Sequence, residues 1–419
     1  MTTASQEKRP STGRPTVPLP PELTRRDAGP FNPPAALTRL GEQGPVHRVT
    51  MLDGDPVWVV TSHELARTLL GDPRLSSDRF RSRRVLEKLP QPIRARLTDK
   101  RARAGSFITM DPPEHTRYRK LLTGQFTVRR MRQLEPRIQR IVDDHLDAMI
   151  AAGPGADLVR AFALPVPSLV ICELLGVEYA DRDEFQERTG KLLRLDLPVA
   201  EMMRLADELR AFMHDLVRAK RAKPTDDMLS GLIEADPTLT DDELIGMANL
   251  LLVAGHETTA NMLALGTFAL LEHPEQLAAL HADPTLIGGA VEELLRYLSI
   301  VHLGVVRTTL AEVEIAGEVV PADSTVLVSV PAGNRDPYHY PRPDELDVTR
   351  ARGPHLAFGH GVHQCLGQQL ARVEMVAGFT GLLSRLPGLR LAVPAADVPM
   401  RDDMLVYGVH ALPITWDAQ

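Results

Sequence analysis

The sequence holds only two cysteines, Cys172 and Cys365, among its 419 residues. So few thiols exclude a disulfide framework and any metal site with four cysteine ligands. An excess of positive charge is also lacking, because 55 Asp and Glu outnumber 48 Lys and Arg and the formal net charge at pH 7 is −7. This balance argues against general binding to nucleic acid. Aromatic residues make up only 4% of the chain, so a ligand cavity should have mostly aliphatic walls.

No apolar stretch follows Met1, so we expect neither a signal peptide nor a membrane anchor. Residues 1–35 are polar and hold eight prolines, a composition typical of a mobile arm. Residues 36–419 are long enough and apolar enough to form a single domain with a large core. A cytoplasmic, monomeric protein is expected, in a reducing compartment that keeps the Cys365 thiol available.

Hydrophobic periodicity predicts helices over most of residues 62–297. Residues 46–51 and 57–61 are joined by an Asp-Gly turn and predict a β-hairpin. Residues 313–330 and the last thirty residues are strand-like and interrupted by proline and glycine. The predicted fold class is therefore mostly α with a small β-rich region.

One glycine-rich segment presents a single cysteine. Residues 358–367 read Phe-Gly-His-Gly-Val-His-Gln-Cys-Leu-Gly, and apolar residues then recur with helical spacing at Leu366, Leu370, Val373 and Ala377. Cys365 is thus predicted at a helix N-terminus, where unpaired N–H groups and the helix dipole favour a thiolate.

Two kinds of site could use this segment. Its glycines would let the backbone turn sharply and approach a flat ligand closely, while Phe358 could pack beside the sulfur and exclude water. A zinc site formed by His360, His363 and Cys365 is the competing interpretation. Zinc would leave the glycines and Phe358 without a purpose.

A second informative stretch begins with a capping box, Thr240-Asp-Asp-Glu243, and continues as an apolar run to Leu271. A helix of about thirty residues would span roughly 45 Å. The polar residues 255–261 at its centre argue against a membrane span. Since apolar residues surround them, we interpret this cluster as the lining of a buried reactive cavity.

The cysteine loop and the sequence Ala254-Gly255-x-Glu257-Thr258 together resemble the cytochrome P-450 family, the haem-thiolate monooxygenases. The resemblance covers residues 35–415 and is closest to soluble actinobacterial members. It implies the cytochrome P-450 fold, with haem b between a long distal helix and a proximal cysteine loop. Cys365 would be the iron ligand.

The resemblance also assigns roles on the long helix. Thr258 would hydrogen-bond the activated oxygen, and Glu257 would feed protons towards it. Gly255 would permit close approach of dioxygen and a local widening of the helix. Thr259 is the fallback for the hydroxyl group, and His256 is expected to have no catalytic role.

The haem periphery should be bound by residues from several segments. Two buried propionates need cationic partners, and four positions match the propionate ligands of the family. The expected propionate ligands are His115, Arg119, Arg307 and His363. Further contacts with the haem are expected from Phe358, Gly359 and Gly367. Asp111 and Pro112 are expected to begin the helix that carries the first two.

Glu293 and Arg296 lie three residues apart and could form a salt bridge on a helix. Their position between the long helix and the cysteine loop matches a structural element of the family, with Arg350 and residues 334–337 in the corresponding downstream region. We assign these residues to folding and not to chemistry.

The resemblance implies a monooxygenase that inserts one oxygen atom of O2 into a C–H bond, by hydroxylation or epoxidation. The substrate would be a bulky hydrophobic molecule such as a polyketide, terpenoid, steroid or xenobiotic. Two alternatives remain open. One is a haem-thiolate peroxygenase driven by hydrogen peroxide, and the other is a haem sensor without turnover.

Electrons must come from outside, because no Gly-x-Gly-x-x-Gly follows a predicted strand. By resemblance, NAD(P)H acts indirectly through a ferredoxin reductase and a ferredoxin. A basic cluster in an otherwise acidic chain could dock that ferredoxin electrostatically. Its members are Arg117, Lys120, Arg129, Arg130 and Arg132.

A second basic run, residues 79–103, matches part of the lid over the distal pocket in the family. It could favour substrates that carry a carboxylate, or it could be an ordinary mobile and soluble loop. The pocket walls are otherwise expected from apolar residues, namely Leu251, Val253, Ala254, Val301, Leu303 and Leu405.

Overall fold

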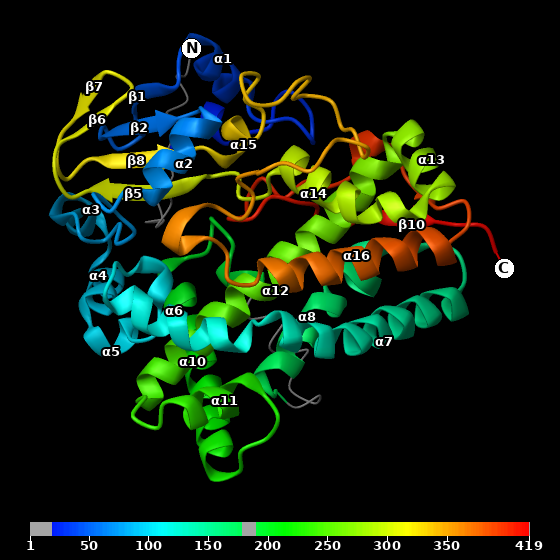
Figure 1. Cartoon of the computed structure of the whole chain (residues 1–419), viewed down its shortest axis with the longest axis horizontal. Helices are drawn as coiled ribbons and strands as arrows, with labels where there is room; N and C mark the ends of the chain where they lie inside the picture. Colours follow the sequence, from blue (N-terminus) through cyan, green and yellow to red (C-terminus); the bar gives the residue numbers. More distant parts are fainter. Residues whose placement is uncertain (1–18, 178–189, 419) are drawn as a thin grey trace, which may run out of the picture.

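The computed structural model describes residues 19–177 and 190–418. Helices fill most of the molecule and a small β region lies at one end (Figure 1). The α-helices are α1 (Ala35–Gln43), α2 (His63–Gly71), α3 (Arg83–Lys88), α4 (Gln91–Thr98), α5 (Lys100–Arg103), α6 (Glu114–Gln125), α7 (Val128–Ala152), α8 (Pro165–Leu175), α10 (Val199–Ala222), α11 (Met228–Ala235), α12 (Asp241–Leu271), α13 (Pro274–Ala282), α14 (Ile287–Leu298), α15 (Val330–Gly333) and α16 (Gln368–Arg385).

Short helical turns connect several of these helices. They are η1 (Pro21–Leu23), η2 (Phe107–Thr109), the π-helical turn η3 (Val159–Ala163), η5 (Pro284–Leu286), η6 (Gly361–His363) and η7 (Ala395–Asp397). The strands are β1 (Val46–Thr50), β2 (Pro56–Val60), β3 (Leu75–Ser76), β4 (Ala156–Asp157), β5 (Val305–Thr309), β6 (Val313–Ile315), β7 (Glu318–Val320), β8 (Thr325–Val328), β9 (Arg390–Leu391) and β10 (Pro413–Thr415).

The largest sheet has the strand order β1-β2-β8-β5-β3. The predicted hairpin is confirmed, because β1 and β2 pair antiparallel with Val46 opposite Val60. Strand β8 runs parallel to β2 and antiparallel to β5, which sets Arg307 opposite Val326. The sheet thereby carries Arg307, a predicted haem contact, on one of its inner strands.

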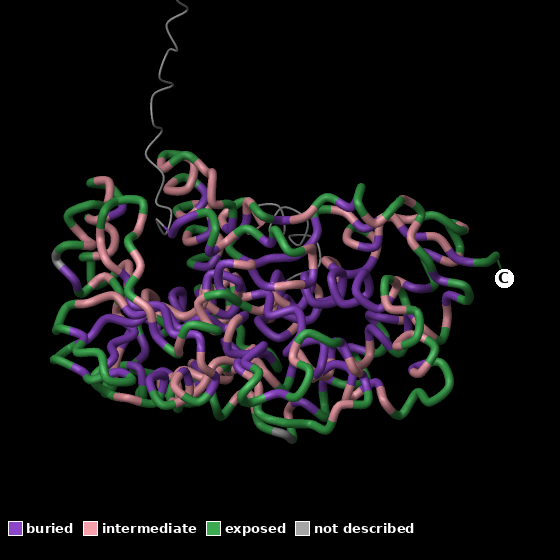
Figure 2. The backbone as a smooth tube through the Cα atoms, turned by 90° about the horizontal axis from the view of Figure 1, so that it is seen from above, coloured by how far each residue is buried: buried purple, intermediate pink, exposed green. Residues whose placement is uncertain are grey.

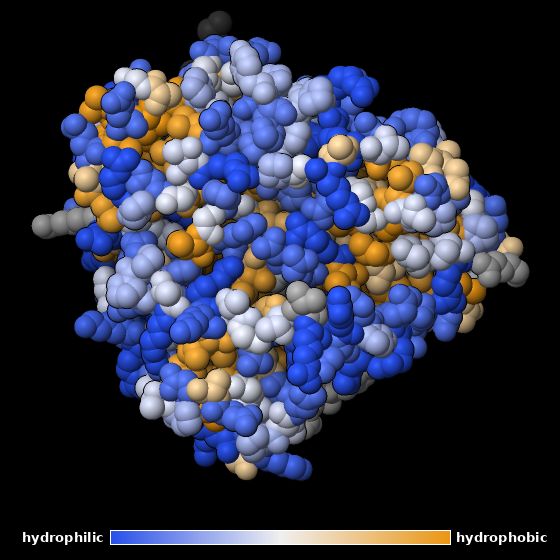
Figure 3. Space-filling view, in the orientation of Figure 1, coloured by the Kyte–Doolittle hydropathy of each residue, from blue (hydrophilic) through white to orange (hydrophobic). Residues whose placement is uncertain are grey.

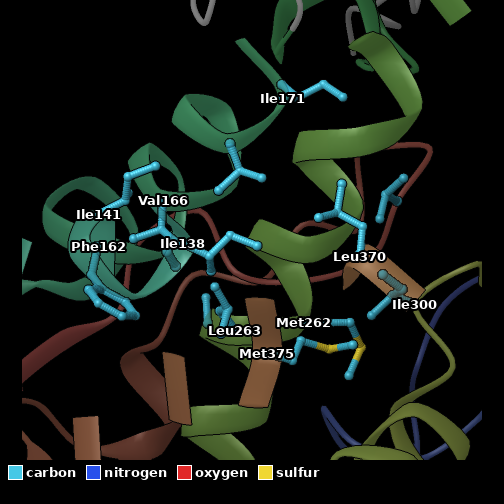
Figure 4. Close-up of a cluster of buried hydrophobic side chains, with 14 of the residues drawn as sticks. Ile138, Ile141, Phe162, Val166, Ile171, Met262, Leu263, Ile300, Leu370 and Met375 are labelled. Carbon is cyan, nitrogen blue, oxygen red and sulfur yellow. The ribbon is translucent and has the colours of Figure 1, made fainter. Parts of the chain in front are cut away.

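Helix α12 runs through the middle of the molecule and packs against α8, α10, α14 and α16 (Figure 1). Its predicted capping box is present, since Thr240 and Glu243 each bond the backbone N–H of the other. Figure 4 shows Met262 and Leu263 of α12 beside Met375 of α16 in the large hydrophobic core. In Figure 2 the buried residues, coloured purple, lie in the interior of the molecule.

Residues 19–34 of the expected arm are packed against the domain. Arg26 is buried and donates to the carbonyl oxygens of Leu298 and Ser299 at 2.7 and 3.0 Å. Phe31 makes an edge contact with Phe268 of α12, with ring centroids 4.8 Å apart. The rest of the arm, residues 1–18, lies outside the described residues.

Hydrophilic side chains dominate the face shown in Figure 3, with apolar patches scattered among them. Among the described residues, no helix is both long enough and apolar enough to cross a membrane.

Candidate functional site

The cysteine loop leads into α16, whose N-cap is Gly367. Cys365 therefore lies two residues before the cap, close to its predicted place at the helix N-terminus. The backbone N–H of Cys365 donates to the carbonyl oxygen of Phe358 at 2.8 Å, which closes the loop. The Phe358 ring is half-buried and lies under the guanidinium of Arg372, 4.6 Å from the ring centroid.

The glycines of this loop have local structural reasons. Gly359 and Gly361 adopt φ angles of +67° and +75°, in the left-handed region that side chains disfavour. A Cβ at Gly361 would also lie 2.5 Å from the carbonyl oxygen of Leu70. At Gly359 and Gly367 a Cβ would meet no atom within 4 Å, so these two glycines leave open space beside the loop.

The thiol of Cys365 is reached by solvent yet enclosed by protein on several sides. Burial raises its pKa, while a hydrogen bond from the Gly367 N–H and the charges of Arg119 and Arg372 act in the opposite direction. A bound metal ion would supply the further positive charge that a thiolate needs here. Cys172, by contrast, is fully buried in α8.

Zinc is not supported by the geometry. Across the described ranges, no three His, Cys, Asp or Glu side chains come together as a metal-binding group. His360, His363 and Cys365 therefore do not converge on a common point.

The centre of α12 has one face that differs from the others. Ala254 is exposed and Thr258 is half-buried, although the helix lies in the interior. These residues are four apart and so share a face, while Leu252, Glu257 and Thr259 are buried on other faces. The Thr258 hydroxyl donates to the carbonyl oxygen of Ala254 at 2.8 Å. This face presents a small side chain and a hydroxyl group to open space.

Glu257 lies on a different face from Thr258 and is almost fully buried. Arg401 donates to its Oε2 atom at 2.9 Å, and the Asn261 amide lies 3.4 Å from the same oxygen. His256 is completely buried and its Nδ1 lies 2.8 Å from the carbonyl oxygen of Leu252. Burial lowers the pKa of His256, which fits the expectation that it has no acid role.

The expected widening at Gly255 is absent, because α12 is a continuous α-helix over residues 241–271. A Cβ at this position would lie 3.1 Å from the Ile171 side chain. Glycine here allows α12 and α8 to pack closely, which explains Gly255 without any distortion of the helix. Thr259 is buried, with its hydroxyl 3.5 Å from the Gly255 carbonyl oxygen.

The four predicted propionate ligands come together. The rings of His115 and His363 lie 4.0 Å apart. Arg119 and Arg307 are close enough to both histidines to lower their pKa values, after the larger effect of burial. Burial also lowers the pKa of Arg307 to about 10, with Asp111 as the opposing charge.

These cationic groups have spare hydrogen-bonding capacity. In the part of the chain that the structure describes, both ring nitrogens of His115 and the Nε2 atom of His363 are buried without a partner. Among the described residues, the Arg307 side chain donates only to the carbonyl oxygen of its neighbour Val306, at 3.0 Å. Unpartnered buried donors beside a cysteine fit a ligand with carboxylate groups, and a haem with two propionates is such a ligand.

The helix that carries His115 and Arg119 begins later than expected. It starts at Glu114, with Pro113 at the N-cap position and no side-chain cap. The Asp111 carboxylate instead accepts from the Ser76 hydroxyl and, at 2.8 Å, from the Ser77 N–H. A carboxylate expected to cap a helix therefore ties β3 to the cationic cluster.

The structural role predicted for Glu293 and Arg296 is confirmed. Two hydrogen bonds of 2.8 Å join their side chains, and both residues are buried in α14. Arg350 donates to Glu293 at 3.1 Å, and Arg296 also donates to the carbonyl oxygens of Asn334 and Pro343. This network connects α14 to the segment that leads to the cysteine loop.

Both predicted basic clusters are partly neutralised. Arg117 pairs with Glu243, and Arg130 lies 2.9 Å from Asp226. Lys120, Arg129 and Arg132 are exposed. In the run 79–103, four cations form ion pairs with residues outside the run, and the pairs are Lys88–Asp53, Arg96–Asp207, Arg101–Asp242 and Arg103–Asp78.

These ion pairs attach residues 79–103, which include α4 and α5, to neighbouring parts of the molecule. A groove of about 890 Å³ lies between these helices, α10 and the first turns of α12.

Of the predicted wall residues, Ala254 and Leu405 are exposed and Val253 and Val301 are half-buried. Leu251 and Leu303 are each 9% exposed.

Sequence reasoning missed Arg401. It lies in the strand-like C-terminal region, in no motif, and 144 residues from its partner Glu257. A lone arginine in an irregular segment gives no signal of such a contact.

The chain was compared with known proteins. A model of the family described as Cytochrome P450 matches residues 191–414. Cytochrome P450 105C1 of a Streptomyces species is 51% identical over 386 residues, which span 92% of this chain and 96% of the relative. The structure of Rif16 in complex with R-L is 60% identical, with a TM-score of 0.85, over 95% of this chain and all of the other. CYP105P1 in complex with filipin I is 42% identical, with a TM-score of 0.86, over 97% of this chain and all of the other.

Proposed function

Since the chain belongs to the cytochrome P450 family of monooxygenases, we propose that Cys365 ligates a haem and that the enzyme oxidises a C–H bond of a bulky hydrophobic molecule. The observation that carries this proposal is the cluster of unpartnered buried donors beside Cys365. A ligand with anionic groups would satisfy these donors without altering the fold.

The haem periphery would be held by four side chains. His115, Arg119, Arg307 and His363 would donate to the two propionates. Phe358 would shield the sulfur from water, and the open space beside Gly359 and Gly367 leaves room for a planar ring. A haem with an axial thiolate supplies the reductive activation of dioxygen and the cleavage of its O–O bond.

The residues at the centre of α12 would orient a bound ligand and supply protons to it. The Thr258 hydroxyl lies on the one open face of the α12 centre, where it could hydrogen-bond a ligand opposite Cys365. Glu257 would supply protons to that face from its buried position. The apolar side chains around them would exclude water, which otherwise diverts the reaction.

The substrate is proposed to be large and apolar, such as a polyketide, terpenoid, steroid or xenobiotic. Two features support this class. The wall residues are aliphatic, and the similar protein CYP105P1 forms a complex with filipin I. A carboxylate requirement receives less support, because four cations of the run 79–103 already pair with aspartates.

Electrons would come from NAD(P)H through a ferredoxin reductase and a ferredoxin in the cytoplasm. The exposed residues Lys120, Arg129 and Arg132 are the part of the basic cluster that could meet an acidic partner.

A spectral titration with a library of apolar compounds would find ligands that displace the water on the haem iron. Compounds that bind would then be supplied with NADPH, ferredoxin, its reductase and isotopically labelled dioxygen. We expect one labelled oxygen atom in each product molecule. Turnover with hydrogen peroxide alone would favour the peroxygenase alternative, and binding without any turnover would favour a haem sensor.

Thr258→Ala tests the distal assignment, and Thr259→Ala is the matched control. The first variant should still consume NADPH but release hydrogen peroxide in place of product, while the second should remain coupled. Full coupling in Thr258→Ala would exclude the role assigned to this hydroxyl.

A further inference from the structure

The Glu257 carboxylate is held away from the open face of α12. Its Oε2 atom accepts from Arg401 at 2.9 Å, and its Oε1 atom lies 3.9 Å from Nε2 of His256. A Cβ added at Gly190 would lie 3.2 Å from that same Oε1 atom. Because Glu257 and Thr258 are consecutive, their side chains leave the helix about 100° apart. The proton donor and the hydroxyl it would serve therefore face in different directions.

Arg401 is itself firmly placed. It is 8% exposed, its backbone N–H donates to the carbonyl oxygen of Gly408 at 2.9 Å, and its Nη1 atom also lies 3.3 Å from Oδ1 of Asn261. A Cβ at Gly408 would lie 1.9 Å from that Asn261 oxygen, so only glycine allows the segment to approach α12 so closely. A buried pair with such support is costly to break.

Residues 400–408, the segment that carries Arg401, also reach the predicted substrate wall. Leu405 is 41% exposed, and its N–H donates to the carbonyl oxygen of Leu193 at 2.9 Å. The Leu195 N–H donates to the carbonyl oxygen of Asp403 at 2.9 Å. One short segment thus joins the partner of Glu257 to a residue expected to touch substrate.

We propose that Arg401 is a positioning residue that holds Glu257 away from the oxygen-binding face until substrate, through residues 400–408, loosens the ion pair. This inference rests on the proposed function, since it concerns the delivery of protons in that reaction. While its carboxylate is bound to Arg401, Glu257 is turned aside from Thr258. Release of the pair would let Glu257 take up a proton and turn towards Thr258.

The stoichiometry explains why such control matters. In the productive reaction, dioxygen takes up two electrons and two protons, places one oxygen atom in the substrate and releases the other as water. Without substrate in place, the same electrons and protons convert dioxygen into hydrogen peroxide. NADPH supplies the electrons in both cases, and solvent supplies the protons.

The test needs no known substrate. The holoenzyme is mixed with NADPH, a ferredoxin and its reductase, and the oxidation of NADPH and the formation of peroxide are measured without substrate. Arg401→Gln should raise both rates about fivefold or more, whereas Arg401→Lys should restore part of the control. Adding Glu257→Gln to Arg401→Gln should abolish the increase, because Arg401 acts through Glu257.

Equal rates in Arg401→Gln and the wild-type enzyme would overturn the inference, as would an increase that persists after Glu257→Gln is added. The reduced carbonyl spectrum of each variant checks that the haem site is intact. If Arg401→Gln does not fold, Arg401→Met, which also removes the positive charge, provides the comparison, and unchanged rates there would count against the inference. Failure of the proposed function would be distinct, since the wild-type enzyme itself would then oxidise no compound.

Discussion

His115 places two polar atoms in the protein interior without a partner among the described residues. A buried polar group left in this way costs about 1–3 kcal/mol of folding free energy. The His363 ring lies beside it at a tilt of 44° and also has an unpartnered Nε2 atom, and Arg307 is buried on β5. Folding alone gives no reason for such a cluster, whereas binding of an anionic cofactor does.

Glu374 is a different kind of unpartnered group. It lies in α16, is 2% exposed, and its Oε2 atom has no partner among the described residues. Burial raises its pKa well above the ordinary value of 4.5. The folded protein therefore keeps a proton that the unfolded chain loses above pH 4.5, so the free energy of unfolding falls as the pH rises beyond that value.

Glu374→Gln should remove this dependence. We expect the wild-type protein to lose up to roughly 1.4 kcal/mol of stability per pH unit more than the variant above pH 4.5. Urea unfolding of both proteins between pH 5 and pH 8 measures the difference, in which the contributions of all other groups cancel. Parallel stability curves would show that Glu374 is ionised in the folded state.

Single residues were predictable where local sequence encodes their surroundings. The glycines around Cys365 identify its loop because Gly359 and Gly361 have positive φ angles and Gly361 also lies against the backbone of Leu70. Arg401 could not be found in this way, since its contact depends on how the C-terminal region folds back on α12. Asp111 was assigned to the wrong partner because its serine partners on β3 are distant in sequence.

At the scale of elements, α12 connects residues 79–103, the predicted lid, to the predicted catalytic residue Thr258. Near its N-terminus, Gly246 faces the end of α5, where a Cβ would lie 1.8 Å from the carbonyl oxygen of Ala104. Gly105 makes the reciprocal approach, with its Cβ position 2.1 Å from the carbonyl oxygen of Glu243. The backbone of α12 and the backbone that follows α5 are in direct contact here, with no side chains between them. Neither can shift without displacing the predicted lid.

Gly246→Ala should separate α5 from α12. We expect faster amide hydrogen exchange across residues 100–107 and weaker binding of distal ligands, because the added methyl group collides with backbone. Gly124→Ala in α6 is the control, since a Cβ there meets no atom within 4 Å. That change should leave the lid unaffected and stabilise the protein by about 0.5–1 kcal/mol. Unchanged exchange in Gly246→Ala would contradict the tight contact.

Element boundaries followed local signals where these were strong. The capping box at Thr240 and the periodicity after it predicted α12 over its whole length. The widening predicted at Gly255 was wrong because a glycine within a helix has two explanations. It can allow distortion of the helix, or it can allow close packing on a neighbouring helix. Only the position of Ile171 on α8 distinguishes them, and sequence does not contain that position.

At the scale of the whole molecule, the junction of α6 and α7 is the surface that we propose for an electron donor. Helix α7 packs against α16, the helix that follows Cys365 (Figure 1). Arg129 and Arg132 are exposed there, whereas Arg130 is committed to Asp226. The net charge of the whole chain is −7, which makes this positive region distinctive.

Reversal of Arg129 and Arg132 to Glu should slow reduction by ferredoxin about tenfold at low ionic strength, because electrostatic steering is lost. The difference should shrink as salt is added. Arg218→Glu on α10 is the control, since Arg218 is also exposed but lies on another helix. Stopped-flow reduction kinetics measure the effect, and an equal loss in the control would assign it to net charge alone.

The overall class was predictable because motifs from distant segments had to serve one ligand. Residues 19–34 were not, since their composition resembles an arm while Arg26 and Phe31 bind the body through contacts that sequence does not reveal. The packing of the whole chain decides such cases.

The decisive measurement is the absorption spectrum of the reduced carbonyl complex of Cys365→Ser, compared with Cys172→Ser. Both variants remove one thiol, but Cys172 is buried in α8 and Cys365 opens beside the cationic cluster. Cys365→Ser should lose the thiolate-type spectrum together with oxygenase activity, and Cys172→Ser should keep both. A thiolate-type spectrum that survives in Cys365→Ser would contradict the assignment of Cys365 as the haem ligand.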